Sequence, residues 1–400
     1  LAADSDLYKW LEGACYVYAR TQNPELRVEI DRIAGLILEA QNQDGTIFGS
    51  GRKTKPFDLA VNHDLYIAGH FFEAAVVHHR ATGREELLKA ACRWADFLME
   101  AYENDHPYYR ETREHPEYEL GFLRLGREAG RSEYIDFAAA LALELSTVGP
   151  EVADIRAGGG LHAVRVGYLL AGMADLYLET GRQDMVEHLP GLWKELVNTR
   201  MYITGAIGSH GEQIREQPFD LPLQRLDHDH RHLGETCACV SMILFSWRMH
   251  AITGESEHFD VIERVLYNHF LGAFSLDNQA NFYYNPIHVT GDITGKTDHG
   301  HSPLCTRCRL PEIHSTACCM PNSWRFFGAL PEYVFSHDSE GIFVNLYTSA
   351  TLNHKLDNGN IVKLAVRTDY PHIGEVVFRY EGEKPSDFKL RLRIPAWCRG

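Results

Sequence analysis

The 400-residue sequence predicts a mainly helical protein, an α/α toroid of helix hairpins followed by the start of a β domain. The prediction depends on three observations: a repeated amphipathic helix hairpin with a glycine turn, a long loop that interrupts this repeat, and alternating apolar and polar residues near the C-terminal end. A hydrophobic content of 44 % supplies a large core. We therefore expect one large helical domain and part of a second domain.

Four short turns, each containing a glycine, mark the helical repeat. The runs around them carry apolar residues three and four positions apart, as in DLYIAGHFFEAAVVHHR and EELLKAACRWADFLMEAY. The glycines Gly83, Gly130, Gly181 and Gly254 occupy the position where helices commonly end in a left-handed cap. An earlier hairpin spans Leu7 to Gln41 and turns at Asn23-Pro24. Hairpins bury their apolar faces most completely in a closed double ring, and an open solenoid is the alternative.

A long loop at residues 201–234 widens the last interval between these glycines and is rich in Gly, His and acidic residues. Long loops in compact domains commonly carry function. From about Gly341 the pattern changes, because IFVNLYTSATL, NIVKLAVRTDY, EVVFRYEG and FKLRLRIPAW alternate like half-buried strands. We expect a helical domain over residues 1–337 and an incomplete β-sandwich domain over residues 338–400.

Composition limits the classes of partner. The net charge of −16 argues against nucleic acid, whose binding proteins concentrate Lys and Arg on one face. No apolar stretch is long enough to span a membrane, and the N-terminal residues do not form a signal peptide. We expect a cytoplasmic protein that binds a small molecule or an oligosaccharide. The chain starts without Met and ends within a predicted strand, which is typical of part of a longer protein whose targeting signal could lie elsewhere.

The sequence contains nine cysteines, an odd number, and they are scattered along the chain. This pattern does not resemble the disulfide framework of a secreted protein. A bond between the neighbours Cys318 and Cys319 would need a strained ring. Free thiols or a metal site are therefore expected. Cys305 and Cys308 form a single C-x-x-C, which is a weak zinc or redox signal when it stands alone.

Two groups of these residues directly precede apolar helical runs. Glu235 and Cys237 lie at the start of one run, with Thr236 as the expected N-cap, and Cys318 and Cys319 precede the run PNSWRFFGALPEYVF. Helix N-termini favour thiolate over thiol. Three thiolates and one carboxylate suit four-coordinate zinc. The spacing differs from short zinc-finger spacings, so buried small apolar side chains remain the alternative.

An ordered set of motifs resembles a known family. It includes SDLYKWLEGACY, HDLYIAGHFFEAA, HPEYELGFLRL, LHAVRVGYL, MYITGAIGS, ETCA, ERVLYNHFLGAFSLD, FYYNP, CC-x-PN and LRIPAW. The set is similar to glycoside hydrolase family 127, whose members include β-L-arabinofuranosidases. The resemblance implies an (α/α)6 barrel followed by β-sandwich material, a zinc ion bound by one Glu and three Cys, and a cysteine nucleophile in a retaining mechanism.

The resemblance also implies roles for individual residues of this sequence. The metal ligands become Glu235, Cys237, Cys318 and Cys319, with Cys318 as nucleophile. The general acid/base becomes Glu212, with Glu216 as runner-up. Substrate-binding residues are expected among His63, His70, His115, His162, Tyr66 and Tyr202, although each His taken alone also fits a packing or surface role.

The implied function is a retaining glycoside hydrolase that releases a non-reducing-end sugar, β-L-arabinofuranose or a related furanoside. One alternative is an α/α-barrel glycosidase or lyase of other specificity with structural zinc, and another is a non-catalytic carbohydrate-binding or scaffold protein. A homodimer is compatible with the sequence. The chain departs from its relatives at Thr316, at Met320 and in the QRLDHDHRH segment at residues 224–232, where substrate identity is most open.

Overall fold

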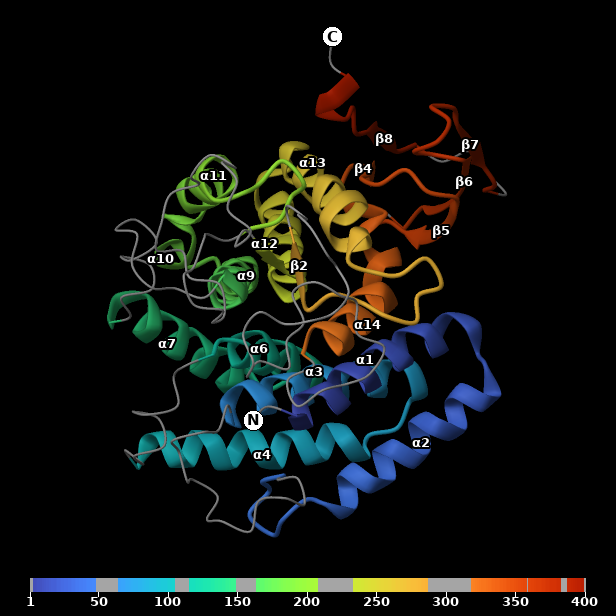
Figure 1. Cartoon of the computed structure of the whole chain (residues 1–400). Helices are drawn as coiled ribbons and strands as arrows, with labels where there is room; N and C mark the ends of the chain where they lie inside the picture. Colours follow the sequence, from blue (N-terminus) through green and yellow to red (C-terminus); the bar gives the residue numbers. More distant parts are fainter. Residues whose placement is uncertain are drawn as a thin grey trace, which may run out of the picture.

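The computed structural model describes residues 3–47, 64–104, 115–148, 163–207, 233–286, 318–357, 359–382 and 387–398. Figure 1 shows helices through most of this chain and a small β region at its C-terminal end. Among the helices in these ranges, none combines the length and the apolar character needed to cross a membrane.

An inner ring of helices forms the centre of the fold. Its members are α1 (Ala3–Thr21), α3 (Asp64–Thr82), α6 (Tyr118–Ala129), α9 (Ala163–Thr180), α12 (Thr236–Thr253) and α14 (Cys319–Ala329). Each packs against the next, and α14 packs back against α1, so the ring closes. This closure confirms the predicted helical barrel and excludes an open solenoid.

Outer helices cover the ring. They are α2 (Pro24–Glu39), α4 (Glu86–Glu103), α7 (Ser132–Val148), α10 (Gln183–Val186), α11 (Leu189–Thr199) and α13 (Glu257–Arg264), which continues into the π-helix η2 (Val265–Phe270). The four predicted turn glycines have φ angles of +67° to +74°, which confirms their left-handed caps. The first hairpin also turns as predicted, because the Asn23 side chain caps α2 by accepting from the N–H groups of Glu25 and Leu26.

The β region consists of two three-stranded sheets. One contains β3 (Phe335–Asp338), β4 (Gly341–Val344) and β8 (Lys389–Leu392), and the other contains β5 (Ala350–Lys355), β6 (Ile361–Thr368) and β7 (Val376–Tyr380). Strands β4 and β8 are parallel, and the other pairs are antiparallel. Ile342 of β4 shares a small core with Val362, Leu364 and Val366 of β6. The division of the chain at residue 337 stays a prediction, and β3 lies across it.

A buried guanidinium links four helices of the ring. Arg325 on α14 donates to Glu73 of α3 at 2.6 Å, to Glu117 beside α6 at 3.0 Å and to the Tyr168 hydroxyl of α9 at 2.7 Å. Arg124 also donates to Glu73, at 2.6 Å. Burial alone would raise the pKa of Glu73, but these guanidinium groups hold it well below its usual range. The cluster therefore fixes α14 relative to its neighbours through charged hydrogen bonds.

Close backbone contact sets the position of α14 against α1. A Cβ atom added at Gly13 would lie 2.8 Å from the Trp324 carbonyl oxygen, and one added at Gly328 would lie 2.9 Å from the Gly13 carbonyl oxygen. The two glycines thus let the backbones of these helices touch.

We predict that Arg325→Met lowers the free energy of unfolding by about 3–5 kcal/mol, because Glu73 and Glu117 would lose their buried cation. Urea unfolding followed by circular dichroism measures this loss. The control is Arg182→Met, which removes an exposed pair with Asp184 and should leave stability nearly unchanged. Equal stability of the two variants would contradict the assignment.

We predict that Gly13→Ala lowers the free energy of unfolding by about 1–3 kcal/mol, because the added methyl group overpacks the contact with Trp324. Thermal melts compare it with Gly35→Ala on α2, where a Cβ meets nothing within 4 Å. The control should be neutral or slightly stabilising, since alanine favours helix more than glycine does. A neutral Gly13→Ala would show that the two helices can separate at little cost.

Candidate functional site

The structure brings together the four side chains predicted as metal ligands. The Sγ atoms of Cys237 and Cys318 are 3.6 Å apart, and Glu235 Oε1 lies 3.9 Å from Cys318 Sγ and 3.7 Å from Cys319 Sγ. One donor atom from each of the four residues lies within 4.8 Å of all the others. These residues come from two segments far apart in the sequence, so the barrel itself assembles the cluster.

Two helix starts and a short strand position the four donors. Glu235 ends β1 (Leu233–Glu235), which pairs with β2 (Tyr284–Pro286). Cys237 lies in the first turn of α12, and Cys319 is the first residue of α14, as the sequence predicts. The predicted N-cap role of Thr236 is wrong. Its hydroxyl donates instead to the Phe282 carbonyl at 2.8 Å, so a distant segment satisfies this group.

The three thiols differ in accessibility and in acidity. Cys237 and Cys319 are buried, whereas Cys318 is partly exposed. Hydrogen bonds from Cys237 and Cys319 hold the pKa of Cys318 well below its usual value, and burial raises the pKa of both donor thiols well above theirs. Cys318 is therefore the sulfur that combines anionic character with access from outside the cluster.

The donor set fits a tetrahedral metal ion. Zinc binds thiolates at about 2.3 Å, which places tetrahedral sulfur ligands about 3.8 Å apart. The Cys237–Cys318 sulfur separation of 3.6 Å is close to that spacing, and Glu235 Oε1 lies 3.7 and 3.9 Å from the sulfurs of Cys319 and Cys318. Three soft sulfurs and one carboxylate oxygen favour zinc over magnesium or calcium.

A second group of metal-ligand type is buried in the barrel, but a cationic side chain already occupies it. It consists of His70, Glu73 and Glu117, with His70 Nδ1 2.9 Å from Glu117 Oε1. The Arg325 guanidinium contacts both carboxylates, so an added metal ion would meet a fixed positive charge. This group is a buried ion pair network.

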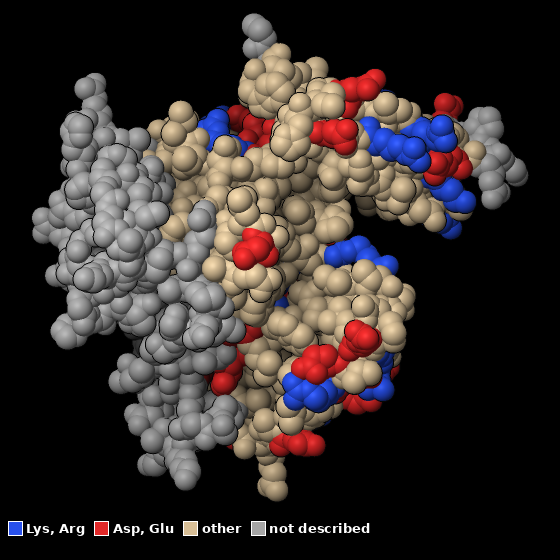
Figure 2. Space-filling model, turned by 45° about the vertical axis from the view of Figure 1, so that its right-hand side comes forward, with Lys and Arg blue, Asp and Glu red and all other residues tan. Residues whose placement is uncertain are grey.

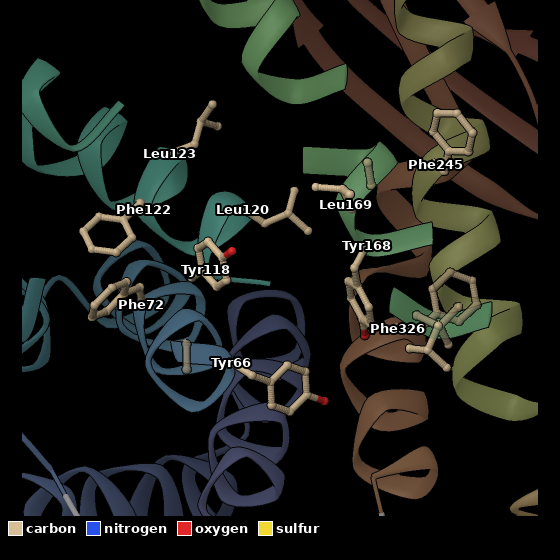
Figure 3. Packing of buried hydrophobic residues seen from close by; sticks show 14 of the residues in the cluster. Tyr66, Phe72, Tyr118, Leu120, Phe122, Leu123, Tyr168, Leu169, Phe245 and Phe326 are labelled. Carbon is tan, nitrogen blue, oxygen red and sulfur yellow. The ribbon is translucent and has the colours of Figure 1, made fainter. Parts of the chain in front are cut away.

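Three of the predicted substrate-binding residues form an aromatic cluster on one side of the barrel interior. The Tyr66 ring centroid lies 4.4 Å from that of His70 and 4.3 Å from that of His115. Tyr168 joins them, 6.0 Å from His115. Figure 3 shows Tyr66 and Tyr168 pointing from different helices toward the same space. Cys318 and Cys237 contribute to raising the pKa of Tyr66, after burial and Tyr168, so this cluster lies within electrostatic reach of the thiols.

The other predicted site residues form two sets, of which the first, Tyr202, lies within the described residues and the second lies outside them. Tyr202 is buried in the turn at residues 201–207, and this turn receives a hydrogen bond from the His269 N–H to the Thr204 carbonyl. His269 in turn lies 3.1 Å from the Gly234 carbonyl beside Glu235, so the turn adjoins the site. The second set lies outside the described residues: Glu212, Glu216, His63, His162, Cys305, Cys308, Thr316 and the segment at residues 224–232. Their roles stay predictions.

Sequence reasoning missed two residues of the site. The Tyr283 hydroxyl lies 3.3 Å from Cys318 Sγ, and its hydrogen bond also lowers the pKa of this thiol. Lys9 is wholly buried with its ammonium 4.9 Å from the Tyr66 ring centroid. Both residues lie in motifs on which the family resemblance depends, FYYNP and DLYKW. A motif match alone, however, does not show which groups these side chains contact.

The described surface agrees with the acidic composition. On the face in Figure 2, Lys and Arg side chains lie beside Asp and Glu side chains, and the described residues there form no single basic patch. Mixed charge of this kind does not resemble a surface that tracks a phosphate backbone.

Comparisons with known proteins agree with these observations. The family model for the β-L-arabinofuranosidase GH127 catalytic domain matches residues 1–332, and the model for the GH127 middle domain matches residues 341–400. A non-reducing end β-L-arabinofuranosidase of Bifidobacterium longum subsp. longum is 30 % identical over 439 residues, covering 99 % of this chain and 65 % of that protein. The chain thus spans somewhat less than two thirds of this curated relative.

Solved structures show the same relationship. A GH127 β-L-arabinofuranosidase from Geobacillus stearothermophilus T6 is 29 % identical, with a TM-score of 0.86 over 100 % of this chain and 66 % of that chain. A sugar epimerase from a ruminal bacterium, 10 % identical with a TM-score of 0.56 over 82 % of this chain and 87 % of its own, shares the fold alone. Because the catalytic-domain model matches most of the sequence, this chain belongs to the GH127 family.

Proposed function

We propose that this protein is a retaining glycoside hydrolase that releases non-reducing-end β-L-arabinofuranose, or a related furanoside, with Cys318 as nucleophile. The observation that carries the proposal is the state of Cys318, the partly exposed sulfur in a cluster whose other thiols are buried. The activity of the Bifidobacterium longum relative supports the choice of sugar. The oligosaccharide substrate would enter from the exposed side of Cys318.

Zinc is the proposed cofactor, held by Glu235, Cys237, Cys318 and Cys319. When bound, zinc would keep these sulfurs ionised at neutral pH and moderate the basicity of the attacking thiolate. The spacing of the donor atoms supports this assignment, since one donor atom of each residue lies within 4.8 Å of the others, close enough to share one ion.

The reaction needs a nucleophile and a proton donor. In the first step the Cys318 sulfur attacks the anomeric carbon, a C–S bond forms, and the bond to the leaving oxygen breaks while Glu212 protonates that oxygen. In the second step Glu212 takes a proton from water, the water oxygen bonds to the anomeric carbon, and the C–S bond breaks. Two displacements retain the anomeric configuration.

Tyr283 has a supporting role in both steps. Its hydroxyl is within hydrogen-bond distance of Cys318 Sγ, so it stabilises the thiolate before attack and again as the sulfur leaves. The proposal gives Tyr66 and His115, whose ring centroids lie 4.3 Å apart, the role of contacting the sugar beside the sulfur.

We predict that Cys318→Ser lowers turnover of p-nitrophenyl β-L-arabinofuranoside by at least about 10³-fold, because a serine hydroxyl is not ionised at neutral pH. Release of nitrophenol measures the rate, and circular dichroism confirms folding. Cys92→Ser on α4 is the matched control and should keep full activity. An active Cys318→Ser with an inactive Glu212→Gln would instead favour carboxylate chemistry and a structural zinc. Sugar binding without turnover by the wild-type protein would indicate a non-catalytic carbohydrate-binding protein.

We predict that the purified protein holds one zinc ion per chain, and that dialysis against a strong chelator removes both zinc and activity. Metal analysis and the same furanoside assay measure the two losses. The melting temperature should fall with the zinc, because a metal bound only by the folded state stabilises it. Re-addition of zinc restores activity, whereas full activity of zinc-free protein would refute the proposed role of zinc.

A further inference from the structure

Lys9 on α1 is a lysine in an unusual environment. Its side chain is wholly buried, and no other lysine in the described part of the chain is buried. Taking an ammonium group out of water is costly unless another charge compensates it. The position therefore needs a physical reason.

The partners of Lys9 compensate its charge less well than those of other buried cations. Its Nζ atom lies 3.2 Å from Ser5 Oγ and 3.4 Å from Asp6 Oδ1. By comparison, Arg248 lies 2.7 Å from its carboxylate partner and Arg325 lies 2.6 Å from Glu73. Asp6 is also partly exposed, so water screens its charge more than it screens that of Lys9.

Lys9 lies against the aromatic cluster of the site. Its ammonium lies 4.9 Å from the Tyr66 ring centroid, and Tyr66 packs against His115. Gly13 and Tyr16 of α1 pack against Trp324 and Gly328 of α14 in that order, so the two helices run side by side in the same direction. Lys9, one turn before Gly13, therefore lies level with the first turn of α14, which begins with Cys319.

The charge of the cluster explains why a cation is needed there. A divalent metal ion bound by three thiolates and one carboxylate leaves two formal negative charges inside the barrel. In such an environment a nearby positive charge stabilises the ionised ligands. We propose that Lys9 is the counter-charge of the metal–thiolate centre and tightens its hold on zinc. This inference depends on the proposed metal function, and it assigns Lys9 a positioning role without contact to the reacting atoms.

The test compares the zinc affinity of three folded variants, measured by competition with a chromophoric chelator. Lys9→Met removes the charge and should weaken zinc binding about 10- to 100-fold, as loss of groups around metal ligands commonly does. Lys9→Arg keeps the charge and should bind zinc nearly as tightly as the wild-type protein. Lys89→Met, which removes an exposed lysine of α4, controls for net charge and should match the wild type. Circular dichroism melts of each variant confirm folding, and Lys9→Gln serves as a second neutral variant where Lys9→Met melts early.

The possible outcomes distinguish the role of Lys9 from the metal function on which it depends. A folded Lys9→Met or Lys9→Gln that binds zinc like the wild type would overturn the role of Lys9 and leave the metal function intact. Equal weakening in Lys9→Arg and Lys9→Met would also overturn it, since shape and not charge would then matter. Failure of the wild-type protein to bind stoichiometric zinc would overturn both. The predicted difference should persist in high salt, because a buried charge is screened far less than a surface charge.

Discussion

The Arg325 guanidinium is the interaction on which the geometry of the site depends. It lies two turns along α14 from the thiols, and its Nε atom donates to Asn322 while its terminal nitrogens contact Glu73 and Tyr168. Asn322 in turn donates its backbone N–H to the Cys318 carbonyl. The first turn of α14 is thereby connected to α3 and α9. A thiol cluster needs this support, because ligand atoms must stay within a few tenths of an ångström of their positions to hold a metal ion.

Charged groups gather in two clusters of the barrel. One cluster pairs Arg325 and Arg124 with carboxylates through short hydrogen bonds. The other is the thiol cluster, where helix N-termini and Lys9 are the proposed compensation for negative charge. The paired cluster holds the start of α14, and with it the thiols, in place. This arrangement agrees with the general need of active sites for fixed, pre-oriented charge.

Local features of the sequence were sufficient to predict most of the fold. The turn glycines and the helical period are properties of neighbouring residues, so they survive in the structure without change. Ring closure was predictable only as the best way to bury many apolar faces. Thr236 shows where local reasoning failed, because its hydroxyl serves a carbonyl 46 residues away. The strand β3, FSHD, gave no alternating signal because it is short and mostly polar.

The cluster of Glu235, Cys237, Cys318 and Cys319 was predictable from the sequence, whereas the places of Lys9 and Tyr283 beside the site were not. Cysteine and glutamate at helix starts are recognisable by residue type, and the family resemblance paired them. Lys9 gave no such signal, because a lysine in an amphipathic helix ordinarily faces water. Only the packing of α1 against α3 encloses it over Tyr66.

The adjacent thiols at the start of α14 lie in two different environments. Cys319 is the first residue of α14 and is buried, which suits the role of supporting ligand proposed for it. Cys318 directly precedes the helix and remains partly exposed. Moving the pair by one residue would exchange these environments, since successive helical positions face directions about 100° apart. The order of the two cysteines relative to the helix start therefore decides which sulfur is partly exposed and which is buried.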